Sequence, residues 1–210
     1  MTNPARIPRR DSQANRQALL DAARTLLARD PQASLNDIAA AAGLSRRTLY
    51  GHYATRDDLI DALTRQGIER LGRLIDEVQQ SDPAVRLAAI ADAIWRDMRT
   101  KNWLAHQSLR HSQMTQFADE LAPLSTELSR IASAGMAAGQ FRTDLSPELL
   151  AQLEISIFVA SCALALSQGL SAEAGRSLVV TQVLLCAGVK LGRASNIYRS
   201  IPEAKEPQWA

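Results

Sequence analysis

Apolar residues recur at helical spacing along most of the chain. In the first such stretch, residues 12–29, the stripe consists of Leu19, Leu20, Ala23, Leu26 and Leu27. Apolar residues with a period near 3.6 mark helices that bury one face. The same pattern predicts helices over residues 34–42, 46–52, 55–78, 83–99, 123–139, 147–169 and 171–192, with a less regular short helix within 100–116. The expected fold class is therefore all-α, with about nine helices.

Capping signals separate the predicted helices near the N-terminal end. Ser34 is followed three positions later by Asp37, and Thr55 by Asp58, which is the spacing of a capping box. Gly43 supplies a residue that tolerates the left-handed conformation in which helices often end. These signals define two short helices followed by a long one.

The last two predicted helices, within residues 147–192, are apolar on nearly every side. Residues 155–172 hold no charged side chain, but they include several serines and a glutamine and are bordered by Glu154 and Glu173. A membrane-spanning helix needs about 20 predominantly apolar residues, so we expect a helix buried on all sides and no membrane partner. A helix that is hydrophobic on every face must be covered on every face. We expect a homodimer through residues 147–192, and the alternative is an ordinary core within one chain.

Composition excludes several protein classes. Proline and glycine are sparse, at 8 and 10 residues, and aromatic residues make up 4% of the chain, which favours helices over a β-sandwich or barrel. Cys162 and Cys186 lie in apolar runs with no second ligand at metal spacing, so they are expected to be small buried hydrophobes in a reducing cytoplasm. The N-terminal residues have no apolar core and do not resemble a secretory signal. We expect a cytoplasmic protein.

Charge is distributed unevenly along the chain. Residues 1–56 hold nine arginines and four aspartates, a net charge of +5, whereas the remaining residues hold 15 basic and 18 acidic side chains, a net charge of −3. A basic head on a mildly acidic body indicates that only the head meets a polyanion.

The segment Leu35–Tyr53 carries the most specific motif. A helix-turn-helix needs a small residue where its helices cross, a glycine in the turn four residues later, and apolar anchors on the second helix. Ala39 and Gly43 meet the first two requirements, and Leu44 and Leu49 meet the third. Ser45 can cap the second helix, and its exposed backbone N–H groups suit a phosphate.

The second helix of this motif presents a set of polar side chains outward. They are Arg46, Arg47, Thr48, Tyr50 and His52. Guanidinium, hydroxyl, phenol and imidazole groups all reach phosphates or base edges of double-stranded DNA. The alternative is a helical hairpin of any α-helical protein, which the clustered basic residues disfavour.

Residues 12–62 resemble the N-terminal domain of the tetracycline-repressor (TetR) family. The matching residues are Ala22-Ala23, Leu26, Ile38-Ala39, Ala42-Gly43-Leu44-Ser45, Thr48-Leu49-Tyr50, His52-Tyr53 and Arg56 to Leu59. Two residues depart from the family's pattern, since Arg47 stands where a small residue is usual and Tyr53 where phenylalanine is common. The resemblance implies three packed helices of which the third enters the major groove of DNA.

By this resemblance, Arg46, Arg47 and Thr48 are candidates for base contacts, and Tyr50, His52 and Arg56 for phosphate contacts. The full set of predicted DNA-binding residues is Ser34, Ser45, Arg46, Arg47, Thr48, Tyr50, His52, Tyr53 and Arg56. The alternatives are a solvated charge for Arg47 and a partly buried packing residue for His52.

The resemblance also implies how the body works: a regulator, most commonly a repressor, leaves a palindromic operator when a small molecule binds in the middle helices. The predicted pocket is lined by Trp95, Met98, Arg99, Trp103, His106, Met114, Phe117, Phe141 and Phe158. Such walls suit a small, largely hydrophobic effector, and the alternative for each residue is plain core packing. We expect no cofactor and no metal, since His106 and His111 are five positions apart and do not share a helical face.

The expected division of the chain has four parts. Residues 1–11 form a flexible basic arm, 12–56 the helix-turn-helix domain, 57–199 the helical effector-binding and dimerisation domain, and 200–210 a loose tail. No Gly-rich phosphate loop, nucleophile elbow or His-Glu metal motif occurs, so we expect no enzyme. The alternative to a ligand-responsive regulator is an architectural or ligand-independent DNA-binding protein.

Overall fold

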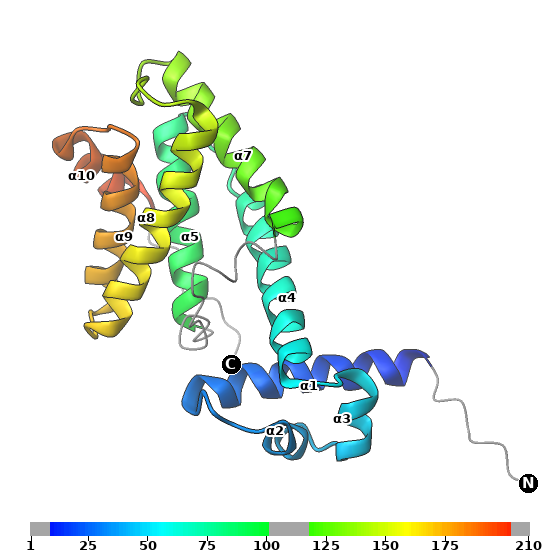
Figure 1. The fold of residues 1–210 in the computed structure, drawn as a ribbon. Coiled ribbons are helices and arrows are strands. Elements are labelled where there is room, and N and C mark those ends of the chain that lie inside the picture. Colours follow the sequence, from blue (N-terminus) through cyan, green and yellow to red (C-terminus); the bar gives the residue numbers. More distant parts are fainter. Residues whose placement is uncertain (1–8, 101–117, 203–210) are drawn as a thin grey trace, which may run out of the picture. The chain divides into compact units, whose positions relative to one another are not determined.

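The computed structural model describes residues 9–100 and 118–202, and all regular structure within them is α-helical (Figure 1). The helices are α1 (Arg9–Arg29), α2 (Leu35–Ala41), α3 (Arg46–His52), α4 (Arg56–Glu77), α5 (Pro83–Thr100), α7 (Ala118–Ala137), α8 (Pro147–Ser167), α9 (Ala172–Cys186) and α10 (Leu191–Ser200). The predicted all-α fold class is confirmed. The short helix expected within 100–116 lies almost entirely outside the described residues.

The first compact unit extends from the N-terminal side to Glu69. Its core is a single cluster from α1, α2, α3 and the first half of α4: Leu19, Leu20, Ala23, Leu27, Ala33, Ile38, Ala39, Leu49, Tyr53, Leu59 and Ala62. Because Leu59 and Ala62 are buried in this cluster, the first half of α4 belongs to the head. The boundary predicted after residue 56 was therefore placed too early.

The second unit comprises residues 70–99 and the described residues from Ala118 onward. In this unit α8 packs against both α7 and α9, and α10 packs against α9. Its largest fully buried side chains are Trp95, Leu150, Leu184, Val179 and Val180. Val179, Val180 and Leu184 of α9 are thus buried within the chain, whereas Leu178 and Leu185 of the same helix are only half-buried.

Several predicted helix ends need correction. α1 begins at Arg9 rather than near Ser12, so the last residues of the predicted arm are helical. α7 begins at Ala118 among the described residues, which places Pro123 inside the helix rather than at its start. Ile201 is 7% exposed, so the predicted loose tail starts after this packed residue and not at 200.

The predicted last helix, over residues 171–192, ends earlier than expected. α9 ends at Cys186, and Gly188 adopts φ 89°, a left-handed conformation that ends the helix. A Cβ at Gly188 would also lie 2.9 Å from Cβ of Arg142. The chain then turns and forms α10, which the sequence did not predict.

A buried ionic cluster joins α5, α9 and the residue that follows α10. Asp92 is fully buried and its Oδ1 accepts a hydrogen bond of 2.7 Å from Nε of Arg176. Arg96 Nη2 lies 2.8 Å from the other Asp92 oxygen. The Arg176 guanidinium also donates to the backbone oxygen of Ile201 at 3.1 Å and stacks 4.8 Å from the Tyr198 ring centroid. The carboxylate therefore lies at the centre of the packing of three segments.

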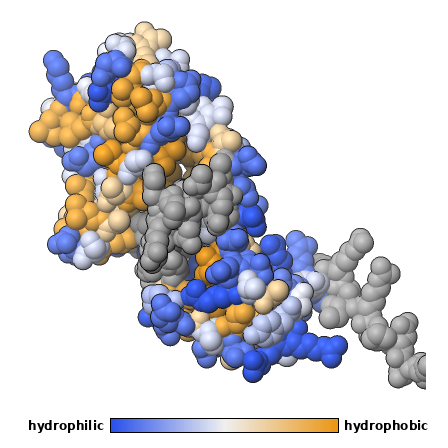
Figure 2. Space-filling model, in the orientation of Figure 1, coloured by the Kyte–Doolittle hydropathy of each residue, from blue (hydrophilic) through white to orange (hydrophobic). Residues whose placement is uncertain are grey.

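α8 is only partly buried within the described part of one chain. Only 33% of its most apolar window is buried, and its length and hydropathy alone would allow a membrane crossing, which is weak evidence by itself. Large apolar side chains at least 37% exposed on α8 are Leu149, Leu153, Val159, Leu164 and Leu166. Apolar residues also form much of the surface of this unit in Figure 2. We refer to these five α8 residues as the α8 apolar face.

Candidate nucleic-acid interface

α2 and α3 form a helix-turn-helix whose ends are fixed by the predicted caps. The Ser34 backbone N–H donates to Asp37 Oδ2 at 3.0 Å, and the Asp37 backbone N–H donates to Ser34 Oγ at 3.3 Å, which completes a capping box. The same reciprocal bonds link Thr55 and Asp58 at the start of α4. The Ser34 hydroxyl, which donates to Asp37 Oδ2 at 2.6 Å, and the Ser34 backbone N–H together lower the pKa of the Asp37 carboxyl.

The turn between α2 and α3 depends on Gly43. Its φ of 67° lies in the left-handed region, where a side chain is strained. The next residue, Leu44, returns its backbone N–H to the carbonyl of Ala39 at 2.9 Å. The glycine thus lets the chain reverse within the two positions needed to begin α3 at Arg46.

α3 is held against the head at one side and capped at its start. Leu49 is fully buried, so it anchors the helix to the core. Ser45 Oγ accepts the Thr48 backbone N–H at 3.0 Å and shares a further hydrogen bond of 2.8 Å with Thr48 Oγ1. Both hydroxyl groups therefore stabilise the start of α3, and this role limits them as independent contacts to a base.

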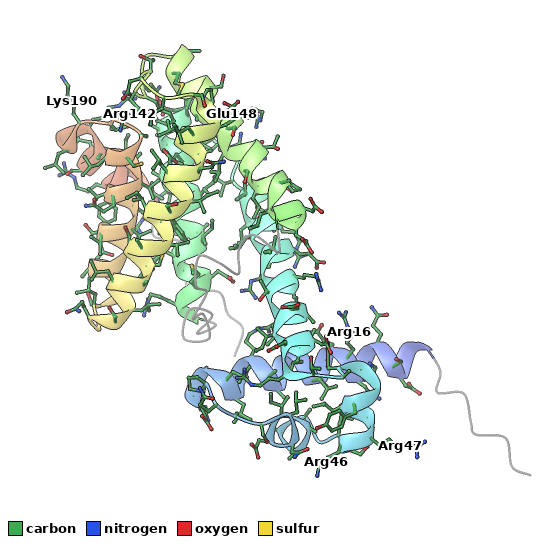
Figure 3. The ribbon with its side chains drawn as sticks, viewed as in Figure 1. Arg16, Arg46, Arg47, Arg142, Glu148 and Lys190 are labelled. Atoms are coloured by element: carbon green, nitrogen blue, oxygen red, sulfur yellow. The ribbon has the colours of Figure 1, made fainter. Side chains whose placement is uncertain are left out.

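Two arginines and a tyrosine form the exposed side of α3. Arg46 and Arg47 are exposed, and Tyr50 is 47% exposed. Both guanidinium groups extend away from the helices in Figure 3. Neither of them has an ion-pair or hydrogen-bond partner among residues 9–100 and 118–202. Arginines on a capped helix with unused donors match the chemistry of bidentate guanine or phosphate recognition.

Three predicted contact residues have other roles in the structure. Tyr53 is only 3% exposed, so its ring belongs to the head core, and its contact with DNA stays a prediction. Arg56 Nη2 donates to the Pro31 carbonyl at 2.6 Å, tying the start of α4 to the loop after α1. His52 is half-buried beside Tyr53, with ring centroids 6.4 Å apart, as the packing alternative expected.

Arg16 was absent from the predicted site but lies close to Tyr53. Burial raises the pKa of the Tyr53 phenol, and the positive charge of Arg16 offsets part of that rise. The Tyr53 hydroxyl is itself buried without a hydrogen-bond partner in the described chain. Periodicity on α1 places Arg16 one turn before Leu20, but only the packing of α1 against α3 brings it near Tyr53.

The predicted effector pocket stays a prediction, and two of its residues are core side chains in the described part of the chain. Trp95 and Met98 are 1% and 2% exposed. The Trp95 indole donates to the Ala172 carbonyl at 3.2 Å, and its ring lies where a Cβ on Gly175 would be, at 2.2 Å. The tryptophan is thus a core residue that joins α5 and α9.

The other predicted pocket residues do not alter this picture. Phe141 is buried, Phe158 is half-buried and Arg99 is exposed. The remaining four, Trp103, His106, Met114 and Phe117, lie outside the described residues.

Comparison with known proteins identifies the head. Residues 19–63 match the family described as bacterial regulatory proteins, tetR family. The similarity to the TetR family thus lies in this N-terminal head. The match covers α2, α3 and the turn between them, together with the second half of α1 and the start of α4. It therefore coincides with the helix-turn-helix that presents Arg46 and Arg47.

Two HTH-type regulators are similar to part of the chain. The HTH-type transcriptional repressor LfrR of Mycolicibacterium smegmatis is 48% identical over 65 residues, which are 31% of this chain and 34% of LfrR. The uncharacterized HTH-type transcriptional regulator YvaF of Bacillus subtilis is 35% identical over 49 residues, 23% of this chain and 26% of YvaF. The matched segments thus span about a third and a quarter of these relatives.

Solved structures share the fold beyond the TetR-like head. RolR in complex with resorcinol has a TM-score of 0.69 at 21% identity, covering 93% of this chain and 99% of RolR. The fatty acid degradation regulator FadR from Bacillus halodurans has a TM-score of 0.70 at 18% identity, covering 81% and 94%. LfrR in complex with proflavine has a TM-score of 0.59 at 23% identity, covering 84% and 96%. At these identities the likeness shows a common fold.

Proposed function

We propose that this protein is a transcriptional regulator that binds double-stranded DNA by placing α3 in the major groove. The observation that carries the proposal is the pair of exposed, unpaired arginines at the start of a capped α3, in a head that matches the TetR family. Arg46 and Arg47 would contact base edges or phosphates, and Tyr50 a phosphate. The net charge of +5 over residues 1–56 would favour the encounter with DNA.

Replacing Arg46 with alanine should weaken binding to the selected operator by about 1–3 kcal/mol, because a bidentate contact to guanine is lost. The operator is first selected from random DNA by the wild-type protein, and affinity is measured by fluorescence anisotropy at fixed salt. Arg73→Ala is the matched control, since Arg73 is exposed on α4 beyond the head. Equal affinities for Arg46→Ala and the control would remove Arg46 from the interface.

We propose further that two copies associate through α8 and α9. A single short helix makes few base contacts, and a two-fold dimer presents two heads to two half-sites of a palindrome. Residues 155–172 hold no charged side chain, and an exposed apolar surface such as the α8 apolar face is stabilised in water by contact with a second copy. We propose that the α8 apolar face contacts a second copy and not a membrane, and that the protein is cytoplasmic.

Leu164→Glu should convert the dimer to a monomer, because it places a charge at the most exposed position of the α8 apolar face, 52% exposed. Sedimentation velocity at micromolar protein measures the change. Leu191→Glu is the control, since Leu191 is 61% exposed but lies on α10. A wild-type protein that sediments as a monomer would contradict the dimer itself.

The regulator is proposed to be a repressor that a small, largely hydrophobic effector releases from DNA. Support comes from relatives only: LfrR is named a repressor, and RolR and LfrR have been solved with resorcinol and proflavine. Release requires that the effector bind the DNA-free conformation more tightly than the DNA-bound one.

A screen of small aromatic compounds should therefore find one that both raises the melting temperature and displaces the operator. Ligand stabilisation follows from preferential binding to the folded state. A compound that stabilises the protein without changing DNA affinity is the internal control. If no compound displaces DNA, a ligand-independent DNA-binding protein becomes the better description.

A further inference from the structure

Gly51 stands on the exposed side of α3, and nothing in the described part of the chain requires a glycine there. It lies within the helix, directly after Tyr50 and one turn after Arg47. Its φ is outside the left-handed region, and a Cβ added there would meet nothing within 4 Å. Alanine would fit this position without strain.

Most of the other glycines are explained by the fold. Gly43 needs its positive φ, whereas a Cβ on Gly135 or Gly175 would lie 2.2 Å from the ring of Phe141 or Trp95. Gly51 meets neither condition. Glycine in a helix is less stable than alanine, so the head loses stability at Gly51 without any gain in packing.

We infer that Gly51 is a close-approach position, where the bare backbone of α3 lets a sugar-phosphate strand of DNA lie against the helix. This inference rests on the proposed DNA-binding function. A side chain at i+4 on a helix leans back over residue i, so a side chain at position 51 would extend toward Arg47. Glycine leaves that surface uncovered. The DNA strand lies against it, and the Arg47 side chain extends beyond the strand into the groove.

Contact between the Gly51 backbone and the DNA strand would set the depth at which α3 enters the groove. Backbone contact at one end of a short helix sets the distance of the arginines at the other end from the base edges. A single methyl group at position 51 would hold the helix away from the strand, although it would strengthen the helix itself. Stability and DNA affinity should therefore change in opposite directions.

The test compares Gly51→Ala with Gly192→Ala in the full chain. Gly192 is the matched control because it is an exposed glycine within α10, and a Cβ there also meets nothing within 4 Å. Melting temperature is followed by circular dichroism, and affinity for the wild-type-selected operator by fluorescence anisotropy. Both variants should melt at or above the wild-type temperature.

Gly51→Ala should bind the operator about ten-fold more weakly, the scale on which an extra methyl group disturbs a close-packed contact. Hydroxyl-radical footprinting should show that one protected sugar per half-site becomes accessible. Gly192→Ala should keep the wild-type affinity and footprint. Gly51→Ser provides a second variant with a similarly small added side chain.

Operator affinity of Gly51→Ala equal to or above that of the wild type would overturn the inference while leaving the proposed function intact. A wild-type protein that selects no DNA sequence would overturn both. The two failures are therefore distinguishable in one set of measurements.

Discussion

Replacing Asp92 with alanine should lower the free energy of unfolding by about 3–5 kcal/mol, because it leaves a buried guanidinium without its carboxylate. Asp92 is fully buried and Arg176 is 8% exposed, so water cannot replace the lost partner. The remaining neighbours of Arg176 are the Ile201 carbonyl, the Tyr198 ring and Glu173, whose carboxylate is 4.0 Å away. None of these supplies the charge-assisted hydrogen bond of 2.7 Å that Asp92 makes.

Urea denaturation at one fixed protein concentration measures this loss, since association would otherwise shift the midpoint. Asp144→Ala is the matched control. Asp144 pairs with Arg142 through two hydrogen bonds of 2.8 and 2.7 Å, but both side chains are exposed. An exposed pair contributes little, so the control should unfold near the wild-type midpoint. If both variants lost a similar free energy of unfolding, the burial of Asp92 would not be the cause of the loss.

Glu154→Gln should instead stabilise the protein, by about 3 kcal/mol at pH 7. Glu154 lies on α8, is 4% exposed, and its Oε1 has no hydrogen-bond partner in the described chain. Burial raises the pKa of this carboxyl from 4.5 to about 8. The folded protein therefore keeps a proton at neutral pH that the unfolded chain releases, and glutamine removes that difference.

The sign of the pH dependence follows from the same shift. Below a pH of about 4.5 both states hold the proton and Glu154 has no effect on the pH dependence of stability. Between 4.5 and about 8 the folded state binds more protons than the unfolded state, so stability falls as pH rises. Above that window the effect levels off. Glu154→Gln should show a flatter decline between pH 5 and 8 than the wild type in urea denaturation.

Glu148→Gln is the control for this prediction, because Glu148 is exposed in the first turn of the same helix. It should retain the wild-type pH dependence. A Glu154→Gln variant no more stable than the wild type at pH 8 would contradict the assignment of a protonated buried carboxyl.

The helix ends that the sequence predicted are those with a side-chain cap. Ser34, Ser45, Ser146 and Ser171 each accept a backbone N–H at the start of a helix, as their positions indicated. α10 was missed because its N-cap is Lys190, which makes no side-chain capping hydrogen bond. Local chemistry is readable from sequence, whereas a helix that begins only because it packs on α9 leaves no local signal.

The site residues divide in the same way. Arg46 and Arg47 could be predicted because their exposure follows from the periodicity of a short helix anchored by Leu49. Tyr53 could not, because its burial depends on α1 and α4 closing around it. Trp95 lies on the buried stripe of α5, and periodicity alone does not separate the wall of a pocket from a core contact.

The hydrogen bond from Arg176 to Ile201 has a consequence for synthesis of the chain. Arg176 is made 25 residues before its acceptor, so the nascent domain holds an incompletely paired cation until α10 has emerged and docked. We expect a chain truncated before residue 201 to stay incompletely packed around Arg176. Such a chain should be cleaved by proteases. Docking of α10 thus completes the hydrogen-bond partners of Arg176.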